Sequence, residues 1–134
     1  MSQPANRFIN PDTLATPTGY THVVETNARR TIFISGQIPL DSQGKLVGAG
    51  DMKAQAEQVF ENLRLALEAV HATFADVIKL TYFVVDISQI QVVREVRNRY
   101  LNADRLPAST AVEVRQLVRK EFLLEVEAIA ALND

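Results

Sequence analysis

Residues 121–132 read EFLLEVEAIAAL, and their side chains alternate between two chemically different sets. In an extended strand, alternate residues point to opposite faces of the sheet. One set is purely apolar and consists of Phe122, Leu124, Val126, Ala128 and Ala130. The other set mixes apolar residues with two carboxylates and consists of Leu123, Glu125, Glu127, Ile129 and Ala131. The pattern predicts a strand with one face in the core and a second face that is only partly apolar.

Two helices are expected before this strand. The clearer one lies in residues 52–70, where apolar residues recur at steps of three and four, and Asp51 is placed to cap its N-terminus. The second and shorter helix is expected over residues 90–100, opened by an S-x-x-Q capping box of Ser88 and Gln91. Both helices are amphipathic, so each of them needs an apolar surface to cover.

The remaining strands are short and rich in β-branched residues. Residues 77–85 are apolar in both alternating sets, which is typical of a central strand covered on both faces. Residues 21–26 and 31–35 flank a short polar link and predict a hairpin, and residues 108–114 predict one more strand. The resulting order is ββαβαββ, an α+β fold with two helices on one face of a sheet. Residues 1–20 are rich in Pro, Asn, Thr and Gly and predict an arm along the surface.

The composition is that of a globular chain of one domain. Its 134 residues are close to the roughly 150 of an average domain, so we expect a single domain over residues 1–134. There are 16 acidic and 14 basic residues, no cysteine and two histidines. The net charge of -2 disfavours nucleic acid as a partner, and the scarcity of His and Cys disfavours a metal site. Because neither a signal peptide nor a membrane span is evident, we expect a cytoplasmic protein with no membrane partner.

The partly apolar face of the sheet needs a cover. If the two helices cover one face, Leu123 and Ile129 remain on the other, together with an apolar row from residues 77–85. Exposed apolar faces of this kind mark interfaces, so we expect a homo-oligomer. The alternative is that the N-terminal arm folds over this face.

The same face carries Glu125 and Glu127, which point the same way. Burial of an unpaired carboxylate is costly, so at least one of them should meet a cation, an amide, water or a ligand. They belong either to a site or to salt bridges between subunits. The basic candidates for such bridges are Arg115, Arg119 and Lys120.

Three stretches of the chain carry a resemblance to one known family. They are residues 35–39 (SGQIP), residues 107–114 (PASTAVEV) and residues 124–130 (LEVEAIA), and in this order and spacing they resemble the RidA/YjgF family. The helical segment 55–70 with Asn62 fits the same pattern. The resemblance implies a chorismate-mutase-like α+β subunit that assembles as a homotrimer, with a small-molecule cleft at each subunit interface.

The resemblance also implies a chemistry, the hydrolysis of reactive enamines and imines to a 2-keto acid and ammonia without metal or cofactor. This reaction needs a guanidinium for the substrate carboxylate, a polar group that orients water, and a carboxyl group that moves a proton. In deaminating members an arginine follows the Pro-Ala of the P-A-R-S-x-V motif, whereas this chain has Ser109. We therefore expect standard 2-imino acid deaminase activity to be weak or absent.

The resemblance assigns candidate roles to individual residues. Glu125 is the candidate that moves a proton or orients water, and Ser35 is the second catalytic candidate. The ligand-binding candidates are Tyr20, Gly36, Arg94, Ser109 and Ala111. Arg94 stands where typical members have an asparagine that faces the cleft. Either the guanidinium that binds the ligand in other members has moved to this helix, or Arg94 is a solvated surface arginine. Ala111 replaces a reactive cysteine of the family.

Three functions compete at this point. The first is a trimer that binds or converts small carboxylate, imine or enamine metabolites. The second keeps the fold but makes the protein a metabolite-responsive regulatory or protein-binding module without turnover. The third is the ribonuclease role attributed to some relatives, which is disfavoured because the chain is acidic and has no paired histidines for acid-base cleavage.

Overall fold

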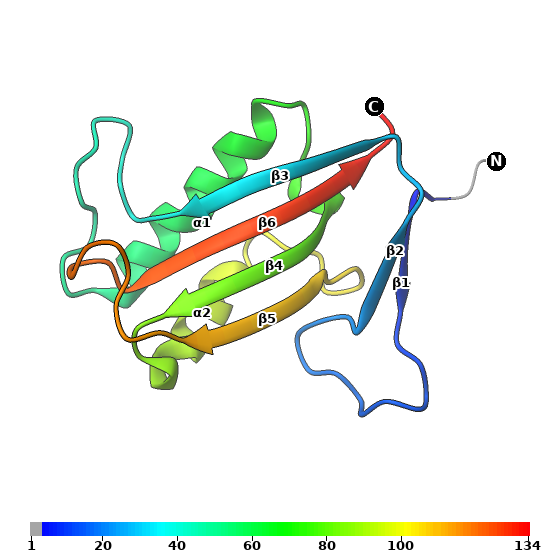
Figure 1. The fold of residues 1–134 in the computed structure, drawn as a ribbon, viewed down its shortest axis with the longest axis horizontal. Helices are drawn as coiled ribbons and strands as arrows, with labels where there is room; N and C mark the ends of the chain where they lie inside the picture. The colour runs from blue at the N-terminus through cyan, green and yellow to red at the C-terminus, as the bar shows by residue number, and fades with distance from the viewer. Residues whose placement is uncertain (1–3) are drawn as a thin grey trace.

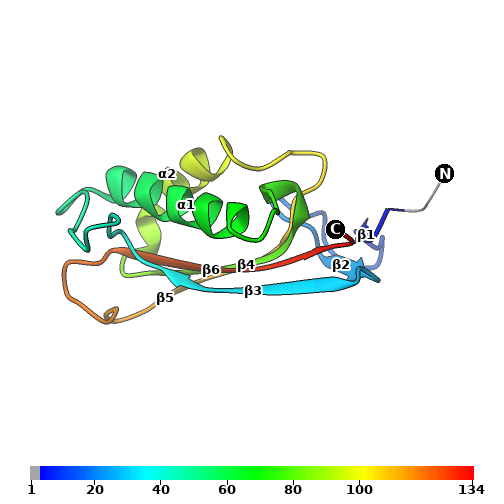
Figure 2. The ribbon, with the colours of Figure 1, turned by 90° about the horizontal axis from the view of Figure 1, so that it is seen from above.

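The computed structural model describes residues 4–134 and shows two helices packed on one face of a four-stranded sheet. Figure 2 shows the two layers edge-on, with both helices on the same side. The elements in chain order are β1 (Asn6–Ile9), β2 (Val23–Thr26), β3 (Arg30–Gln37), α1 (Met52–Glu68), η1 (Phe74–Asp76), β4 (Val77–Val84), η2 (Ile87–Gln89), α2 (Ile90–Arg97), β5 (Ala108–Glu113) and β6 (Leu124–Leu132). The expected α+β fold with two helices on one face is confirmed. No helix within residues 4–134 is long and apolar enough to cross a membrane.

The main sheet has the order β3-β6-β4-β5, with β6 and β4 in the middle (Figure 1). β6 is antiparallel to both of its neighbours, and β4 is parallel to the edge strand β5. The apolar set of β6 is buried under the helices, as its alternation predicts. Residues 77–85 were predicted as a central strand covered on both faces, and β4 confirms the central position, although within residues 4–134 only the face under the helices is covered.

The core lies between the sheet and the helices. Asp51 caps α1, because its side chain accepts a hydrogen bond from the backbone amide of Ala54. The α1 side chains that face the sheet are fully buried, among them Phe60. Phe60 stacks on Phe74 and Tyr100, with ring centroids 6.1 and 5.5 Å away. These aromatic contacts fix the positions of both helices over the sheet.

The predicted hairpin of residues 21–35 is wrong. β2 pairs with β1 in a separate two-stranded ribbon, whereas β3 pairs with β6 in the main sheet. The ribbon stands at one end of the sheet (Figure 1), where the side chain of Asn6 donates to the carbonyl of Ala131 at 2.9 Å. The link between β2 and β3 contains no Gly, and the tight turns of two-residue hairpins need residues that accept positive φ. The chain therefore passes from one sheet to the other at this link.

The predicted capping box of Ser88 and Gln91 is also wrong. Asp86 accepts from the backbone amide of Ser88 at 3.0 Å and starts the short turn η2 two residues earlier. α2 then continues from η2, and its N-cap residue Gln89 makes no side-chain capping hydrogen bond. An upstream Asp thus provides the cap that the sequence pattern assigned to Ser88.

Residues 4–20 of the N-terminal arm do not cover the open face of the sheet, so the alternative is wrong for this described part of the arm. The arm runs past the helical layer instead, where the carbonyl of Gly19 accepts from Arg97 and the amide of Thr21 donates to the carbonyl of Pro107. On the opposite face Phe33 is 77% exposed. Within residues 4–134, this face therefore remains open along its β3 edge.

Candidate functional site

One group of candidate residues meets in a pocket on the helical side of the sheet, which we call the helix-side pocket. The arm, β4, α2 and β5 each contribute to its wall. The lining residues are Thr18, Gly19, Tyr20, Tyr82, Ile90, Arg94, Arg97, Ser109 and Ala111. The structure thus brings together four of the residues singled out in the sequence, namely Tyr20, Arg94, Ser109 and Ala111. The cavity measures about 30 Å³, which is room for a water molecule or a small polar head group but not for a whole metabolite.

Arg97 is a pocket residue that the sequence reasoning missed. Arg97 is only 7% exposed, and its guanidinium donates to the carbonyl of Gly19 at 3.0 Å and to the side chain of Asn98. Within residues 4–134 no carboxylate lies within 4.0 Å of it. A signal was present, because Arg97 falls on the apolar stripe of the second helix, one and two turns after Val93 and Ile90. An arginine on that stripe is directed inward.

Tyr82 lies beside Arg97 in the pocket wall and is 3% exposed. Burial raises the pKa of its phenol to about 12, although the nearby positive charge of Arg97 acts in the opposite direction. The hydroxyl is therefore protonated at neutral pH. It has no hydrogen-bond partner within residues 4–134, which leaves a buried donor unsatisfied.

A second group, the sheet-face cluster, consists of Ser35, Gly36 and Glu125. Ile34 pairs with Ala128 and Gln37 pairs with Val126, so Ser35 and Gly36 together oppose the single residue between those partners, Glu127. This is a β-bulge, a feature that redirects side chains and is frequent beside functional sites. The carboxylate of Glu125 lies directly over Gly36, in the space that a Cβ at this position would occupy. Glycine at position 36 therefore sets where this carboxylate sits.

The carboxyl group of Glu125 is tuned toward its protonated form. Partial burial raises its pKa, and the negative charge of Glu127 on the same strand face raises it further. A carboxyl group with a raised pKa exchanges protons closer to neutral pH than an ordinary one. A raised pKa is one of the properties that a proton-moving carboxyl group needs.

The two groups lie on opposite faces of the sheet. Ser109 and Ala111 on β5 pair with Leu80 and Tyr82 on β4, which point toward the helices. Glu125 pairs with Phe83, which points to the open face because neighbouring strand residues alternate. One subunit therefore cannot bring the helix-side pocket and the sheet-face cluster into a single cavity.

Comparison with known proteins identifies the family. The model of the endoribonuclease L-PSP family matches residues 11–132, which is most of the chain. The chain belongs to the RidA/YjgF family. The resemblance seen in residues 35–39, 107–114 and 124–130 is thereby confirmed.

Several RidA/YjgF relatives cover the chain at similar identity. Protein DfrA of Myxococcus xanthus is 37% identical over 131 residues, which are 97% of this chain and 98% of that protein. Human 2-iminobutanoate/2-iminopropanoate deaminase is 37% identical over 102 residues, 75% of this chain and 72% of the human protein. The crystal structure of the Rid-family protein YyfB of Yersinia pestis superposes with a TM-score of 0.87 at 35% identity, covering 96% of this chain and 99% of that chain. The chorismate-mutase-like fold expected from the sequence is confirmed.

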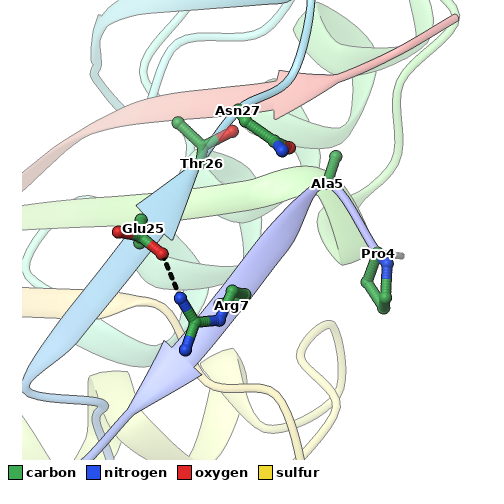
Figure 3. Close-up of a pocket in the computed structure, with 6 residues that line it drawn as sticks. All are labelled: Pro4, Ala5, Arg7, Glu25, Thr26 and Asn27. Carbon is green, nitrogen blue, oxygen red and sulfur yellow. Dashed lines mark hydrogen bonds and ion pairs between the residues drawn. The ribbon is translucent and has the colours of Figure 1, made fainter. Parts of the chain in front are cut away.

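A larger hollow elsewhere on this RidA/YjgF subunit lacks the features of a site. It lies beside the β1–β2 ribbon, measures about 480 Å³ and is drawn in Figure 3. Its charged groups are Arg7 and Glu25, which pair with each other (Figure 3) and are both more than half exposed. An ion pair of this kind contributes little and presents no unpaired charge to a ligand.

We expect Glu125→Gln to raise the melting temperature at pH 7 and to leave it unchanged in acid. The folded-state pKa of Glu125 is raised above its ordinary value of 4.5, so its charged form is disfavoured in the folded protein. In the wild-type protein, the stability linked to the protonated form of Glu125 is thus fully present below pH 4.5 and is lost as pH rises through the raised pKa. Thermal unfolding between pH 4 and pH 8 measures the difference between the two proteins. A lower melting temperature of the variant at pH 7 would instead show that a cation of another subunit pairs with Glu125.

Proposed function

We propose that the protein is a RidA-like homotrimer with a small-molecule cleft between adjacent subunits. The cleft binds or converts small enamine, imine or carboxylate metabolites without a metal or cofactor. The protein acts in the cytoplasm and has neither nucleic acid nor membrane as a partner. One observation carries this proposal, namely that the helix-side pocket and the sheet-face cluster lie on opposite faces of one subunit. Only a second copy can place one beside the other.

The open sheet face supports assembly from identical subunits. Phe33 is 77% exposed on β3, and Ile129 and Phe83 lie on the same face of the neighbouring strands. An exposed apolar patch of this kind is typical of an interface. When another subunit packs on this face, Glu125 comes to lie between two protein surfaces, where a ligand can reach it from the helix-side pocket of the neighbour.

The chemistry of such a cleft is the addition of water to a carbon-nitrogen double bond. Water attacks the imine carbon, the nitrogen takes up a proton, and the resulting carbinolamine releases ammonia and leaves a 2-keto acid. Glu125, with its raised pKa, supplies the proton to nitrogen and takes one from the attacking water. The hydroxyl of Ser35 orients the water, and Tyr20 helps to hold the ligand from the other side of the cleft.

The serine at position 109, in place of the family arginine, favours a second candidate function. A charge-assisted hydrogen bond contributes roughly 1.5 to 3 kcal/mol, so loss of the arginine that deaminating relatives carry at this position weakens carboxylate binding by about 10- to 150-fold. The chain then serves as a metabolite-responsive regulatory or protein-binding module that keeps the cleft but does not turn a substrate over. Depletion of a substrate by the purified protein separates this function from the enzymatic one.

We expect deamination of 2-iminobutanoate to be at least about 10-fold slower than by an arginine-bearing relative. The imine is generated in situ by a pyridoxal-phosphate enzyme, and release of the 2-keto acid is followed with a coupled dehydrogenase. The human deaminase is a suitable reference, because its name states this activity. Turnover equal to that of an arginine-bearing relative would show that another group replaces the missing arginine completely.

A further inference from the structure

The floor of the helix-side pocket holds hydrogen-bond donors without acceptors. A guanidinium has five N–H groups. In Arg97 one donates to the carbonyl of Gly19 and two donate to Asn98, which leaves two of the five without a partner. Among residues 4–134, the hydroxyl of Tyr82 in the same pocket wall has no partner either. Donors gathered in this way present a site for an acceptor.

The floor also carries an uncompensated positive charge. Within residues 4–134, neither Arg97 nor Arg94 has a carboxylate within 4.0 Å. Tyr82 does not provide the missing negative charge, since its pKa of about 12 keeps it neutral. Burial of a guanidinium without an anion is costly, so an anionic ligand at this point would stabilise the pocket. Arg94 is exposed on the rim, whereas Arg97 is buried.

We propose that Arg97 and Tyr82 form an oxyanion subsite that takes the carboxylate head of the ligand. This inference rests on the proposed function and adds to it the group that recognises the ligand. Arg97 supplies the charge and Tyr82 donates its hydroxyl hydrogen, while Ser109 offers a second hydroxyl at the mouth. The cavity of about 30 Å³ admits only the head group, so the rest of the ligand extends toward the sheet-face cluster of the neighbouring subunit.

The subsite explains how this chain can bind a small carboxylate and still convert 2-imino acids slowly. Arg97 projects from α2, whereas the arginine of deaminating relatives projects from the strand that here carries Ser109. A carboxylate held from α2 places the imine carbon differently with respect to Glu125. The protein therefore binds small carboxylates and converts 2-imino acids slowly, because a reacting atom must be held close to its ideal position.

Tyr82→Phe is the decisive variant, because it removes one buried oxygen and no packing atoms. We expect its melting temperature to stay equal to that of the wild type or to rise, since an unsatisfied buried hydroxyl disappears. The affinity of Tyr82→Phe for 2-oxobutanoate in isothermal titration should fall about 10-fold. Its affinity for the uncharged 2-oxobutanamide should stay the same. Arg97→Lys keeps the positive charge but loses the planar set of N–H donors, so its affinity for 2-oxobutanoate should also fall about 10-fold. Arg94→Gln is the matched control on the rim of the same helix, and its effect should be several-fold smaller.

Acetate separates failure of the subsite from failure of the proposed function. It has a carboxylate but no carbonyl or imine, and its binding is followed by the NMR signals of the Tyr82 ring, identified by their absence in Tyr82→Phe. If wild type, Tyr82→Phe and Arg97→Lys bind 2-oxobutanoate equally, the subsite is wrong and the proposed function stands. If acetate shifts the Tyr82 signals while 2-oxobutanoate neither binds nor forms from its imine, the subsite stands and the proposed function fails. If acetate leaves the Tyr82 signals unmoved, the pocket floor holds water and the subsite is wrong.

Discussion

Phe33→Glu is expected to convert the proposed homotrimer into monomers of 14.9 kDa. The Phe33 side chain is 77% exposed in one subunit and lies on the edge strand β3 of the open sheet face, so its apolar surface becomes buried only when subunits assemble. A glutamate at the same position would place an unpaired carboxylate inside the interface, near Glu127 on the neighbouring strand, and a buried unpaired charge is far more costly than the lost apolar contact. Native mass spectrometry at micromolar concentration measures the change in mass.

The matched control for this prediction is Leu65→Glu. Leu65 is also exposed, at 47%, but it lies on α1 in the helical layer, away from the open sheet face. We expect this variant to remain trimeric. Each single subunit should keep its fold in both variants, because neither side chain is part of the core. A wild-type protein that is monomeric, or a Phe33→Glu protein that is still trimeric, would contradict the proposed interface.

The second large effect concerns catalysis in the proposed cleft. Glu125→Gln should lower kcat for 2-iminobutanoate by about 100-fold or more, because a positioned acid-base group contributes about 100- to 10,000-fold. Affinity for 2-oxobutanoate should change only a few-fold, since the glutamine keeps the size and polarity of the side chain. Gly36→Ala should lower kcat in the same way, because its Cβ occupies the space of the Glu125 carboxylate and displaces it without any change of charge. The in situ imine assay measures both variants.

Glu127→Gln is the control for the loss of negative charge. It removes a carboxylate from the same face of the same strand, but Glu127 is exposed and lies two residues away from Glu125. We expect its kcat to stay within a few-fold of the wild-type value. Equal rates for wild type and Glu125→Gln would remove Glu125 from the mechanism.

Much of the fold was predictable from periodicity. The alternation of residues 121–132 predicted which face of β6 is buried, and the three- and four-residue spacing of residues 52–70 predicted α1 and its cap at Asp51. Pairing between strands was less predictable. Two neighbouring strand-like runs predict a hairpin, yet β2 and β3 belong to different sheets, because partners distant in sequence, β1 and β6, take up their hydrogen bonds. Local sequence carries no information on such distant partners.

The candidate site was predictable as a set of residues but not as an arrangement. Tyr20, Arg94, Ser109 and Ala111 were singled out from the sequence, and the structure places them around one pocket. The alternation of residues 121–132 placed Glu125 on the face away from the core, but the helix-side position of Ser109 and Ala111 became clear only from the register of β5 on β4, because residues 108–114 have no alternation that assigns their faces. Arg97 was missed for a physical reason. Arginine usually faces solvent, and part of the enclosure of this guanidinium comes from the arm residue Gly19, which is far away in sequence.

A mixing experiment tests most directly the claim that two subunits complete one site. Ser109→Phe fills the helix-side pocket, and Ser35→Phe blocks the sheet-face cluster, so each variant alone, once shown to be trimeric, should fail to bind 2-oxobutanoate. In mixed trimers formed by co-expression, random assortment pairs an intact pocket with an intact cluster in about a quarter of the interfaces. If two subunits complete one site, binding should return at roughly that fraction of sites in isothermal titration. Mixed trimers that bind no more ligand than either variant alone would contradict it.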